Sequence, residues 1–290
     1  MKTYLGNSTP FDLDATLCCG QTFRWERQGE WWYGVVRDKA FKIRQIGNKL
    51  EFENVDANFV KFYFGLDDDL SRICAQICKD KHIKRAVEMF EGLRILHQDP
   101  WECLISYICA TYKNIAAIRQ MLQKLSCKFG ERIYFDGQDF YAFPIPEELA
   151  KASVAEFLEC GLGYRAKYLH ATVQAVNAGD FILELLRKEP YEKAKLELQR
   201  LSGVGLKAAD CILLFSLEKH EAFPVDVWIR RVLLKYYSTH FQKEFITKVL
   251  NRKSLTRTEY ERLNRFGREY FGEHAGYAQE YLYNYERTKQ

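Results

Sequence analysis

Apolar and polar residues alternate along the N-terminal part of the chain. Between residues 21 and 55 the alternation has a period of two, and the segment is rich in Trp, Tyr, Val and Ile. Alternation of this kind is typical of half-buried antiparallel strands. The polar stretches at 28–30 (Gln-Gly-Glu) and 47–49 (Gly-Asn-Lys) fit hairpin turns between such strands. The sequence therefore predicts a small antiparallel sheet near the N-terminus.

From about residue 56 onward the apolar residues recur every three or four positions, which is typical of helices. Three acids open the helix expected from residue 70, and Pro-Glu-Glu opens the one expected from residue 146. The segment 99–130 fits a buried helix pair that ends at Gly130. These patterns predict an α+β fold, with a sheet domain over residues 1–99 and an all-helical domain over residues 100–290.

A glycine hairpin is expected between two of these helices. Residues 201–210, Leu-Ser-Gly-Val-Gly-Leu-Lys-Ala-Ala-Asp, follow a polar helix and lead into an apolar one, which is a helix–hairpin–helix pattern. Gly203 and Gly205 permit backbone conformations that a Cβ atom would forbid. The N–H groups that start the second helix favour an anion, such as a DNA phosphate. The alternative is a tight turn at Gly203, Val204 and Gly205 that binds nothing.

Two ionisable residues follow the hairpin. Lys207 falls in the first turn of the second helix, where the helix dipole disfavours a cation. A desolvated lysine there is expected to have a lowered pKa, and its neutral amine could attack carbon and form a Schiff base. Asp226 follows Pro-Val and precedes another helix, a position typical of an N-cap, from which its carboxylate could stabilise a cationic sugar. A surface lysine and a purely structural N-cap are the alternatives.

Composition narrows the classes of protein. With 47% hydrophobic residues, the 290-residue chain is folded, and its 15% aromatic residues suit either a core or stacking on flat ligands. A net charge of +4 is a weak signal, and seven Lys and Arg between residues 248 and 268 fit either a polyanion-binding face or a solvated helix. The nine cysteines contain no Cys-x-x-Cys pair, so reduced thiols in an intracellular compartment, cytoplasm or nucleoid, are expected. Neither a signal peptide nor a membrane span is apparent.

Residues 201–211 together with Pro-Val-Asp at 224–226 resemble the helix–hairpin–helix, Gly/Pro-Asp superfamily of DNA base-excision glycosylases. The lysine is similar to that of the bifunctional members, which remove a base and cut the backbone. Further stretches resemble the 8-oxoguanine DNA glycosylase/AP lyase family, and the resemblance runs from about residue 10 onward. These stretches are Leu-Cys-Cys-Gly-Gln-Thr-Phe-Arg-Trp at 17–25, Gly-Leu-Gly-Tyr-Arg-Ala-Lys-Tyr-Leu at 161–169, Lys-Ala-Ala-Asp-Cys at 207–211 and Ala-Gly-Tyr-Ala-Gln-Glu-Tyr-Leu-Tyr at 275–283.

The resemblance implies a TATA-binding-protein-like N-terminal domain and a two-lobed helical domain with a DNA cleft between the lobes. It implies that the target nucleotide is flipped out of the duplex. Lys207 would attack the sugar C1′, and Asp226 would stabilise the developing positive charge. The base pocket would be formed by Cys211 and Tyr283, which sandwich the base, Gln279, which binds its Watson–Crick edge, and the Gly20 carbonyl, which accepts the N7–H that guanine lacks. For Cys211 and Tyr283 ordinary core packing is the alternative.

Other residues would contact the rest of the duplex. The hairpin at 203–205 would hold a phosphate, Tyr164 would wedge beside the estranged base, and Arg165 would bond to that base. The chain departs from the eukaryotic pattern near Asn114, because Tyr112 replaces an asparagine and Ala117 replaces an arginine that helps to bind the opposite cytosine. Trp228 likewise replaces a histidine near a phosphate. These departures predict weak discrimination between the bases opposite the lesion.

Three functions are therefore weighed. A bifunctional 8-oxoguanine glycosylase/lyase is favoured; a monofunctional alkylpurine glycosylase would lack Lys207, and a non-catalytic DNA-binding module would need neither Asp226 nor Gln279. The expected partner is damaged double-stranded DNA, with no membrane, and the protein is expected to act as a monomer. No cofactor is expected, and whether a metal ion sits at the hairpin–phosphate contact stays open.

Overall fold

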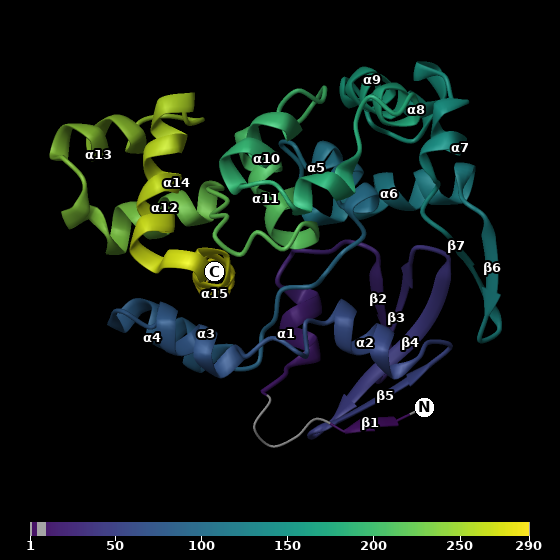
Figure 1. Ribbon diagram of the computed structural model, residues 1–290, viewed down its shortest axis with the longest axis horizontal. Helices are drawn as coiled ribbons and strands as arrows, with labels where there is room; N and C mark the ends of the chain where they lie inside the picture. The colour runs from purple at the N-terminus through teal and green to yellow at the C-terminus, as the bar shows by residue number, and fades with distance from the viewer. Residues whose placement is uncertain (1, 5–9, 290) are drawn as a thin grey trace.

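The structure is a computed structural model that describes residues 2–4 and 10–289 of the chain. An antiparallel sheet with strand order β1-β5-β4-β3-β2 occupies the N-terminal part (Figure 1). Its strands are β1 (Lys2–Tyr4), β2 (Trp25–Gln28), β3 (Trp31–Val36), β4 (Lys39–Ile46) and β5 (Lys49–Glu53). Four of the five lie between residues 21 and 55, so the predicted sheet is confirmed.

The turns of the sheet depend on glycines with positive φ. Gly29 has φ +61° and Gly47 has φ +54°, and each lies between two paired strands, so both predicted hairpins are confirmed. Gly34 on β3 lies opposite Trp25 on β2, and a Cβ atom at Gly34 would lie 2.6 Å from the indole ring. The close contact lets Trp25 lie flat against the strand and form part of the buried sheet core.

Fifteen α-helices and three short 3-10 helices make up most of the remaining described chain. They are α1 (Leu13–Cys18), α2 (Ala57–Tyr63), α3 (Leu70–Ile77), α4 (Lys81–Met89), α5 (Pro100–Cys109), α6 (Ile115–Phe129), α7 (Pro146–Ala150), α8 (Val154–Glu159), α9 (Arg165–Asn177), η1 (Leu183–Arg187), α10 (Tyr191–Leu198), α11 (Leu206–Ser216), α12 (Val227–Tyr236), η2 (Ser238–His240), α13 (Lys243–Leu250), α14 (Arg257–Phe271), η3 (Gly272–His274) and α15 (Ala275–Arg287). The predicted helix starts are confirmed, because Asp69 caps α3 and Pro146 is the first residue of α7. The pair α5–α6 ends at Gly130, as expected.

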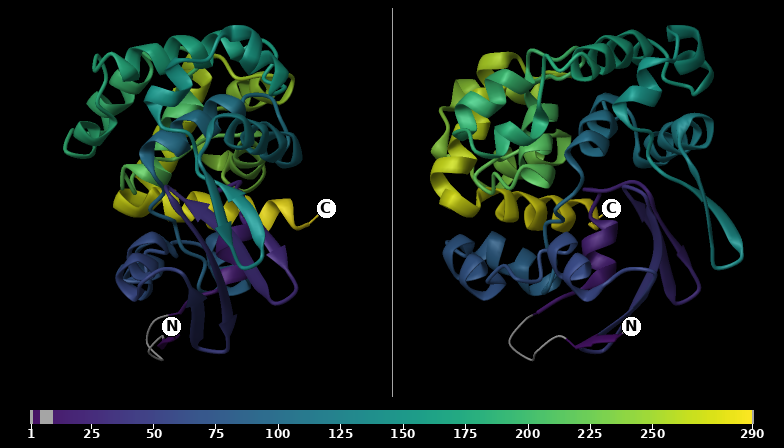
Figure 2. Two further views of the ribbon diagram at one scale, coloured as in Figure 1. Left: turned by 90° about the vertical axis from the view of Figure 1, so that its right-hand side faces the viewer. Right: turned by 45° about the vertical axis from the view of Figure 1, so that its right-hand side comes forward.

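The expectation of an all-helical region after residue 99 is wrong in one place. Strands β6 (Arg132–Phe135) and β7 (Gln138–Tyr141) form a hairpin whose turn is Asp136-Gly137. Asp-Gly between alternating residues is itself a hairpin signal. The hairpin reaches back to the N-terminal sheet (Figure 2), where Phe140 stacks on Tyr33 with ring centroids 6.0 Å apart and Asp136 lies 2.8 Å from the Lys42 ammonium.

Two hydrophobic clusters hold the molecule together. One lies beneath the sheet and is closed by α1 and α2. The larger one joins α5, α11, α12 and α15 and also takes in α3 and α4, which pack under α15 in both views (Figures 1 and 2). Helices from the first hundred residues therefore pack in the core of the helical part, and the domain boundary at residue 99 stays a prediction. None of the helices described is long and apolar enough to cross a membrane.

Candidate active site

The glycine hairpin forms between α10 and α11, as predicted. Gly203 has φ +86°, and a Cβ atom there would lie 2.9 Å from the Cβ atom of Tyr168 on α9. Gly205 is the N-cap of α11 and offers no side-chain hydrogen bond to the first turn, while the space where its Cβ would project is open. The first N–H groups of α11 are thus left for a ligand, which is the geometry of an anion site.

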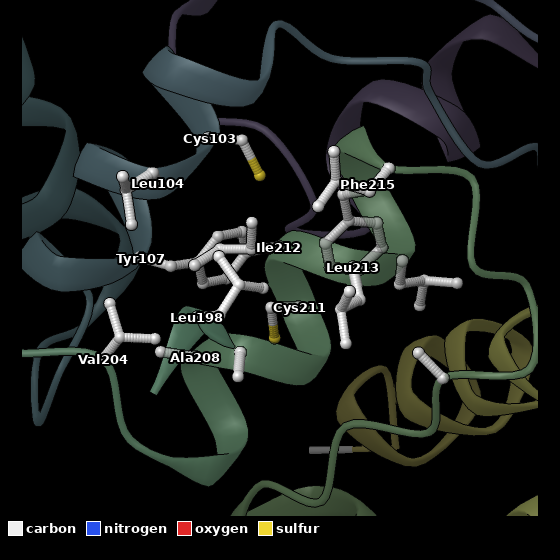
Figure 3. Close-up of a cluster of buried hydrophobic side chains, with 14 of the residues drawn as sticks. Cys103, Leu104, Tyr107, Leu198, Val204, Ala208, Cys211, Ile212, Leu213 and Phe215 are labelled. Carbon is white, nitrogen blue, oxygen red and sulfur yellow. The ribbon is translucent and has the colours of Figure 1, made fainter. Parts of the chain in front are cut away.

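Lys207 lies in the first turn of α11, one turn before Cys211. Its ammonium lies 4.8 Å from the centroid of the Tyr107 ring on α5, and Figure 3 shows Cys211 and Tyr107 in the same buried cluster. Burial favours the neutral amine, but the interactions of Lys207 with Cys211, Asp226 and Glu280 raise its pKa, so the expected lowering of this pKa is wrong. Burial raises the pKa of Cys211 to about 12, so its thiol is neutral at pH 7 and the two carboxyl groups provide the opposing charge.

Asp226 caps α12, as its position in the sequence predicted. Its carboxylate accepts hydrogen bonds from the backbone N–H groups of Trp228 and Ile229, at 2.9 and 2.8 Å. Burial raises the pKa of Asp226, while these N–H groups and the charge of Lys207 oppose the increase. The structure thus brings the predicted nucleophile and the predicted carboxylate into one electrostatic environment, although they belong to different helices.

The proposed base pocket involves α15 and the segment after α1. Gly20 has φ +96°, and a Cβ atom there would lie 3.3 Å from both the Tyr283 hydroxyl and the Arg287 guanidinium. Gln279, one turn before Tyr283, is only 3% exposed, and its Oε1 has no hydrogen-bond partner in the described part of the chain. Buried side-chain oxygens usually have partners, so this unpaired one is a candidate contact for a bound ligand.

Glu280 was missed by the sequence reasoning. It is 3% exposed on α15, it interacts with Cys19, Lys207 and Asp226, and its Oε2 has no partner within residues 10–289. Burial raises its pKa to about 7. A glutamate between a glutamine and a tyrosine in a mostly apolar helix was the available signal, because acids are rarely buried without a reason.

The residues expected at the opposite strand lie around the N-termini of α6 and α9. Tyr112 is 83% exposed with φ +53°, and Tyr164 is 54% exposed. Arg165 is buried, donates to the Thr111 carbonyl and lies 4.4 Å from the Tyr164 ring centroid. Its guanidinium therefore lies between the Thr111 carbonyl and the Tyr164 ring, and its bond to an estranged base stays a prediction.

Two further candidates have local partners. Asn114 caps α6 by accepting from the Ala117 N–H at 2.9 Å. Trp228 is half-buried, with the Arg231 guanidinium 4.8 Å from its ring centroid. Their contacts with DNA stay predictions.

The basic run covers the end of α13 and most of α14, and three of its seven Lys and Arg side chains pair with the two acids of the run. Arg252 lies 3.0 Å and Lys248 3.7 Å from the Glu259 carboxylate, and Arg257 lies 2.8 Å from that of Glu261. These pairs favour the reading of this run as a solvated helix surface.

Comparison with protein families agrees with this fold. Residues 105–254 match the model of the HhH-GPD superfamily base excision DNA repair protein, and residues 4–104 match that of the 8-oxoguanine DNA glycosylase, N-terminal domain. The fold, the hairpin with its lysine and the capping aspartate thus define the class of the molecule as a helix–hairpin–helix base-excision DNA repair protein.

Individual relatives narrow the class. The chain is 31% identical to the N-glycosylase/DNA lyase OGG1 of Arabidopsis thaliana, over 95% of this chain and 77% of the plant protein. It is 30% identical to the N-glycosylase/DNA lyase of Saccharomyces cerevisiae, over 97% and 84% of the two chains. The 8-oxoguanine glycosylase/lyase of Clostridium acetobutylicum, solved with double-stranded DNA, superposes with a TM-score of 0.86 at 32% identity, over 100% and 98% of the chains. The chain belongs to the 8-oxoguanine DNA N-glycosylase/lyase family.

Proposed function

We propose that this protein removes 8-oxoguanine from double-stranded DNA and then cleaves the backbone at the abasic site. The observation that carries the proposal is the half-buried Lys207, which lies beside Cys211 and shares its electrostatic environment with Asp226. A nucleophile, a carboxylate and an uncapped helix start meet at this one site. A bare DNA-binding module would need only the helix start.

The chemistry follows from the two charged groups. The Lys207 amine, after losing its proton, bonds to C1′ while the glycosidic bond breaks and its electron pair leaves with the base. Asp226 stabilises the positive charge that develops on the sugar. Opening of the sugar ring gives the Schiff base, which acidifies the C2′ hydrogen. Loss of that proton expels the 3′ phosphate and cuts the strand. The raised pKa of Lys207 means that the ammonium must lose its proton before the amine can bond to C1′.

Recognition of the base rests on the unpaired groups of the pocket. The Gln279 Oε1 is a buried acceptor for a donor on the Watson–Crick edge, and the Gly20 carbonyl would accept the N7–H of 8-oxoguanine. Guanine has no hydrogen on N7, so it would leave the carbonyl unpaired at a cost of about 1–3 kcal/mol. Tyr283 and Cys211 would hold the faces of the ring.

The proposal includes weak discrimination between the bases opposite the lesion. Ala117 has no group that can bond to cytosine, and Asn114 is engaged in capping α6. Tyr112 and Tyr164 present exposed rings, which stack on any base. Single-turnover excision from four duplexes, each with a different opposite base, is expected to give similar rates, and a strict preference for cytosine would contradict this part.

Borohydride trapping tests the main proposal. Wild-type protein is expected to form a covalent adduct with a duplex that carries 8-oxoguanine, and none with an undamaged duplex. Lys207→Gln is expected to abolish the adduct. Lys193→Gln on α10 is the matched control, because Lys193 is exposed and paired with Glu189 at 2.9 Å. Base release without any adduct would indicate a monofunctional glycosylase, and neither adduct nor release would leave a DNA-binding module.

A further inference from the structure

A cluster of metal-binding side chains lies at the other end of α11 from Lys207. Asp68, His97 and His220 each present one ligand atom, and these three atoms all lie within 4.8 Å of one another. The His97 Nε2 lies 3.9 Å from the Asp68 Oδ2. An eleven-residue helix is about 16 Å long, so this cluster is separate from the glycine hairpin. We propose that it binds a divalent transition-metal ion, with Zn²⁺ as the best fit.

The cluster is assembled from three distant parts of the chain. Asp68 lies in the loop between α2 and α3, His97 in the segment before α5, and His220 in the loop between α11 and α12. All three are half-buried. The two imidazoles and the carboxylate come from separate loops and segments. Neither helical spacing nor helix capping therefore explains why they lie together.

Unpaired nitrogens point to a ligand. Both ring nitrogens of His97 and the Nε2 of His220 are shielded from solvent, and none has a hydrogen-bond partner among the residues that the structure describes. The separation of 3.9 Å between His97 and Asp68 is too long for a hydrogen bond. Buried polar atoms are nearly always paired, and one metal ion would satisfy one ring nitrogen of each of the two histidines.

The surroundings hold the ligands in place. The Tyr277 hydroxyl on α15 donates to the Asp68 Oδ2 at 3.0 Å, a contact of the kind that orients a metal-binding carboxylate. The Arg94 guanidinium donates to the backbone carbonyls of Gly65 and Asp68, which fixes the loop that carries the carboxylate. The site is thus supported from two further segments of the chain.

The donor set selects the class of ion. Two imidazoles and one carboxylate suit Zn²⁺ in a tetrahedral arrangement, with water in the fourth position. Mg²⁺ and Ca²⁺ prefer oxygen ligands alone. The His220 loop continues directly to the capping residue Asp226, so the ion would join the N-terminal part of the chain to the loop that positions the catalytic carboxylate. Its expected role is to stabilise this junction, because a ligand bound only by the folded state adds to its stability.

Metal binding to tag-free protein tests the proposal. After dialysis against EDTA, titration with Zn²⁺ by calorimetry is expected to show one saturable site, and Zn²⁺ is expected to raise the Tm. Co²⁺ is expected to give the visible absorption of a tetrahedral ion. His97→Asn and His220→Asn are each expected to weaken Zn²⁺ binding at least tenfold and to abolish the rise in Tm. His240→Asn, at an exposed histidine far along the chain, is the matched control.

Asp68→Asn keeps the shape of the third ligand and tests Zn²⁺ binding a second time, in case the histidine variants fail to fold. It is expected to weaken Zn²⁺ binding while the metal-free Tm stays near that of the wild type. The absence of a saturable site in the wild type would overturn the proposal, as would equal Zn²⁺ affinity in the wild type and the two histidine variants. Neither result bears on borohydride trapping, so this proposal and the glycosylase proposal fail independently.

Discussion

Asp210 and Cys211 are neighbours on α11, yet they belong to two polar clusters of opposite kinds. Asp210 is fully buried and accepts hydrogen bonds from four groups, which are the side chains of Tyr191, Lys195, Tyr260 and Asn264; we call these five residues the Asp210 cluster. Cys211 belongs to what we call the Lys207 site, whose members are Lys207, Cys211, Asp226, Gln279 and Glu280. There the Gln279 Oε1 and the Glu280 Oε2 have no partner within the described chain.

The difference indicates that the Asp210 cluster stabilises the fold, whereas the Lys207 site is built to bind a ligand. In the Asp210 cluster the buried carboxylate is neutralised by the charge of Lys195, 2.9 Å away, and accepts hydrogen bonds from three neutral donors. The cluster therefore fixes α10, α11 and α14 to one another. The Lys207 site leaves groups unpaired that a bound nucleotide could use. A complete cluster stabilises the fold, whereas an incomplete one lowers stability and keeps binding capacity available. One helix can hold both because adjacent residues project about 100° apart.

The largest expected effect is in the Asp210 cluster. Asp210→Asn leaves the buried Lys195 ammonium without its counter-charge and is expected to lower the free energy of unfolding by about 3–5 kcal/mol. Urea denaturation measures this loss. Asp139→Asn removes an exposed ion pair with Arg132 and is the control, with an expected loss under about 1 kcal/mol. Equal losses of stability in the two variants would contradict the conclusion that the Asp210 cluster stabilises the fold.

Glu280→Gln is expected to change how stability depends on pH. The folded-state pKa of about 7 lies above the ordinary value of 4.5, so the neutral carboxyl is favoured by folding and this contribution is complete below pH 4.5. The wild type therefore loses roughly 3 kcal/mol as the pH rises from about 4.5 to about 7, and the glutamine variant does not. Denaturation of both proteins across this range measures the difference.

The same substitution should shift the pH dependence of catalysis. Cys211 and Asp226 raise the pKa of Lys207 more than Glu280 does, so removing the Glu280 carboxylate is expected to move the rising limb of the single-turnover excision profile slightly to lower pH. Glu261→Gln, at an exposed pair on α14, is the control. If the wild type and Glu280→Gln show the same dependence of stability and of excision on pH, the Glu280 carboxyl has a partner in solution and the prediction is wrong.

Gln279→Leu is expected to lower activity without lowering stability. Removing an unpaired buried amide oxygen is expected to leave the free energy of unfolding unchanged or raise it by about 1 kcal/mol. Excision of 8-oxoguanine is expected to fall by about tenfold or more, because one contact to the base is lost. A variant that is much less stable than the wild type would place Gln279 with the supporting residues instead.

The smallest effect is expected at Ala117, in the first turn of α6. Ala117→Arg supplies a side chain that can bond to the opposite cytosine, and it is expected to raise the excision ratio of cytosine over the other bases by about tenfold. Ala116→Arg, at the exposed neighbouring position of α6, is the matched control. The same ratio in both variants would indicate that added charge, rather than a base contact, changes the rates.

The sequence determined those features that depend on short spacings. Alternation over residues 21–55 predicted the strands, Gly203 and Gly205 predicted the hairpin, and the position of Asp226 after Pro-Val predicted its cap. Lys207 and Cys211, four residues apart on a helix, had to share a face. Each of these features is set by the backbone geometry of neighbouring residues, so it could be predicted before the tertiary structure was known.

Only the tertiary structure decided what distant residues do to one another. It placed Asp226 and Glu280, from two other helices, in the electrostatic environment of Lys207, where together with Cys211 they raise the pKa of the lysine against expectation, and it turned the Arg165 guanidinium toward a backbone carbonyl. It also gathered Asp68, His97 and His220 from segments up to 152 positions apart (220 minus 68). A pKa or a ligand set depends on every charge and donor within a few ångströms, and spacing along the chain carries no information about such neighbours.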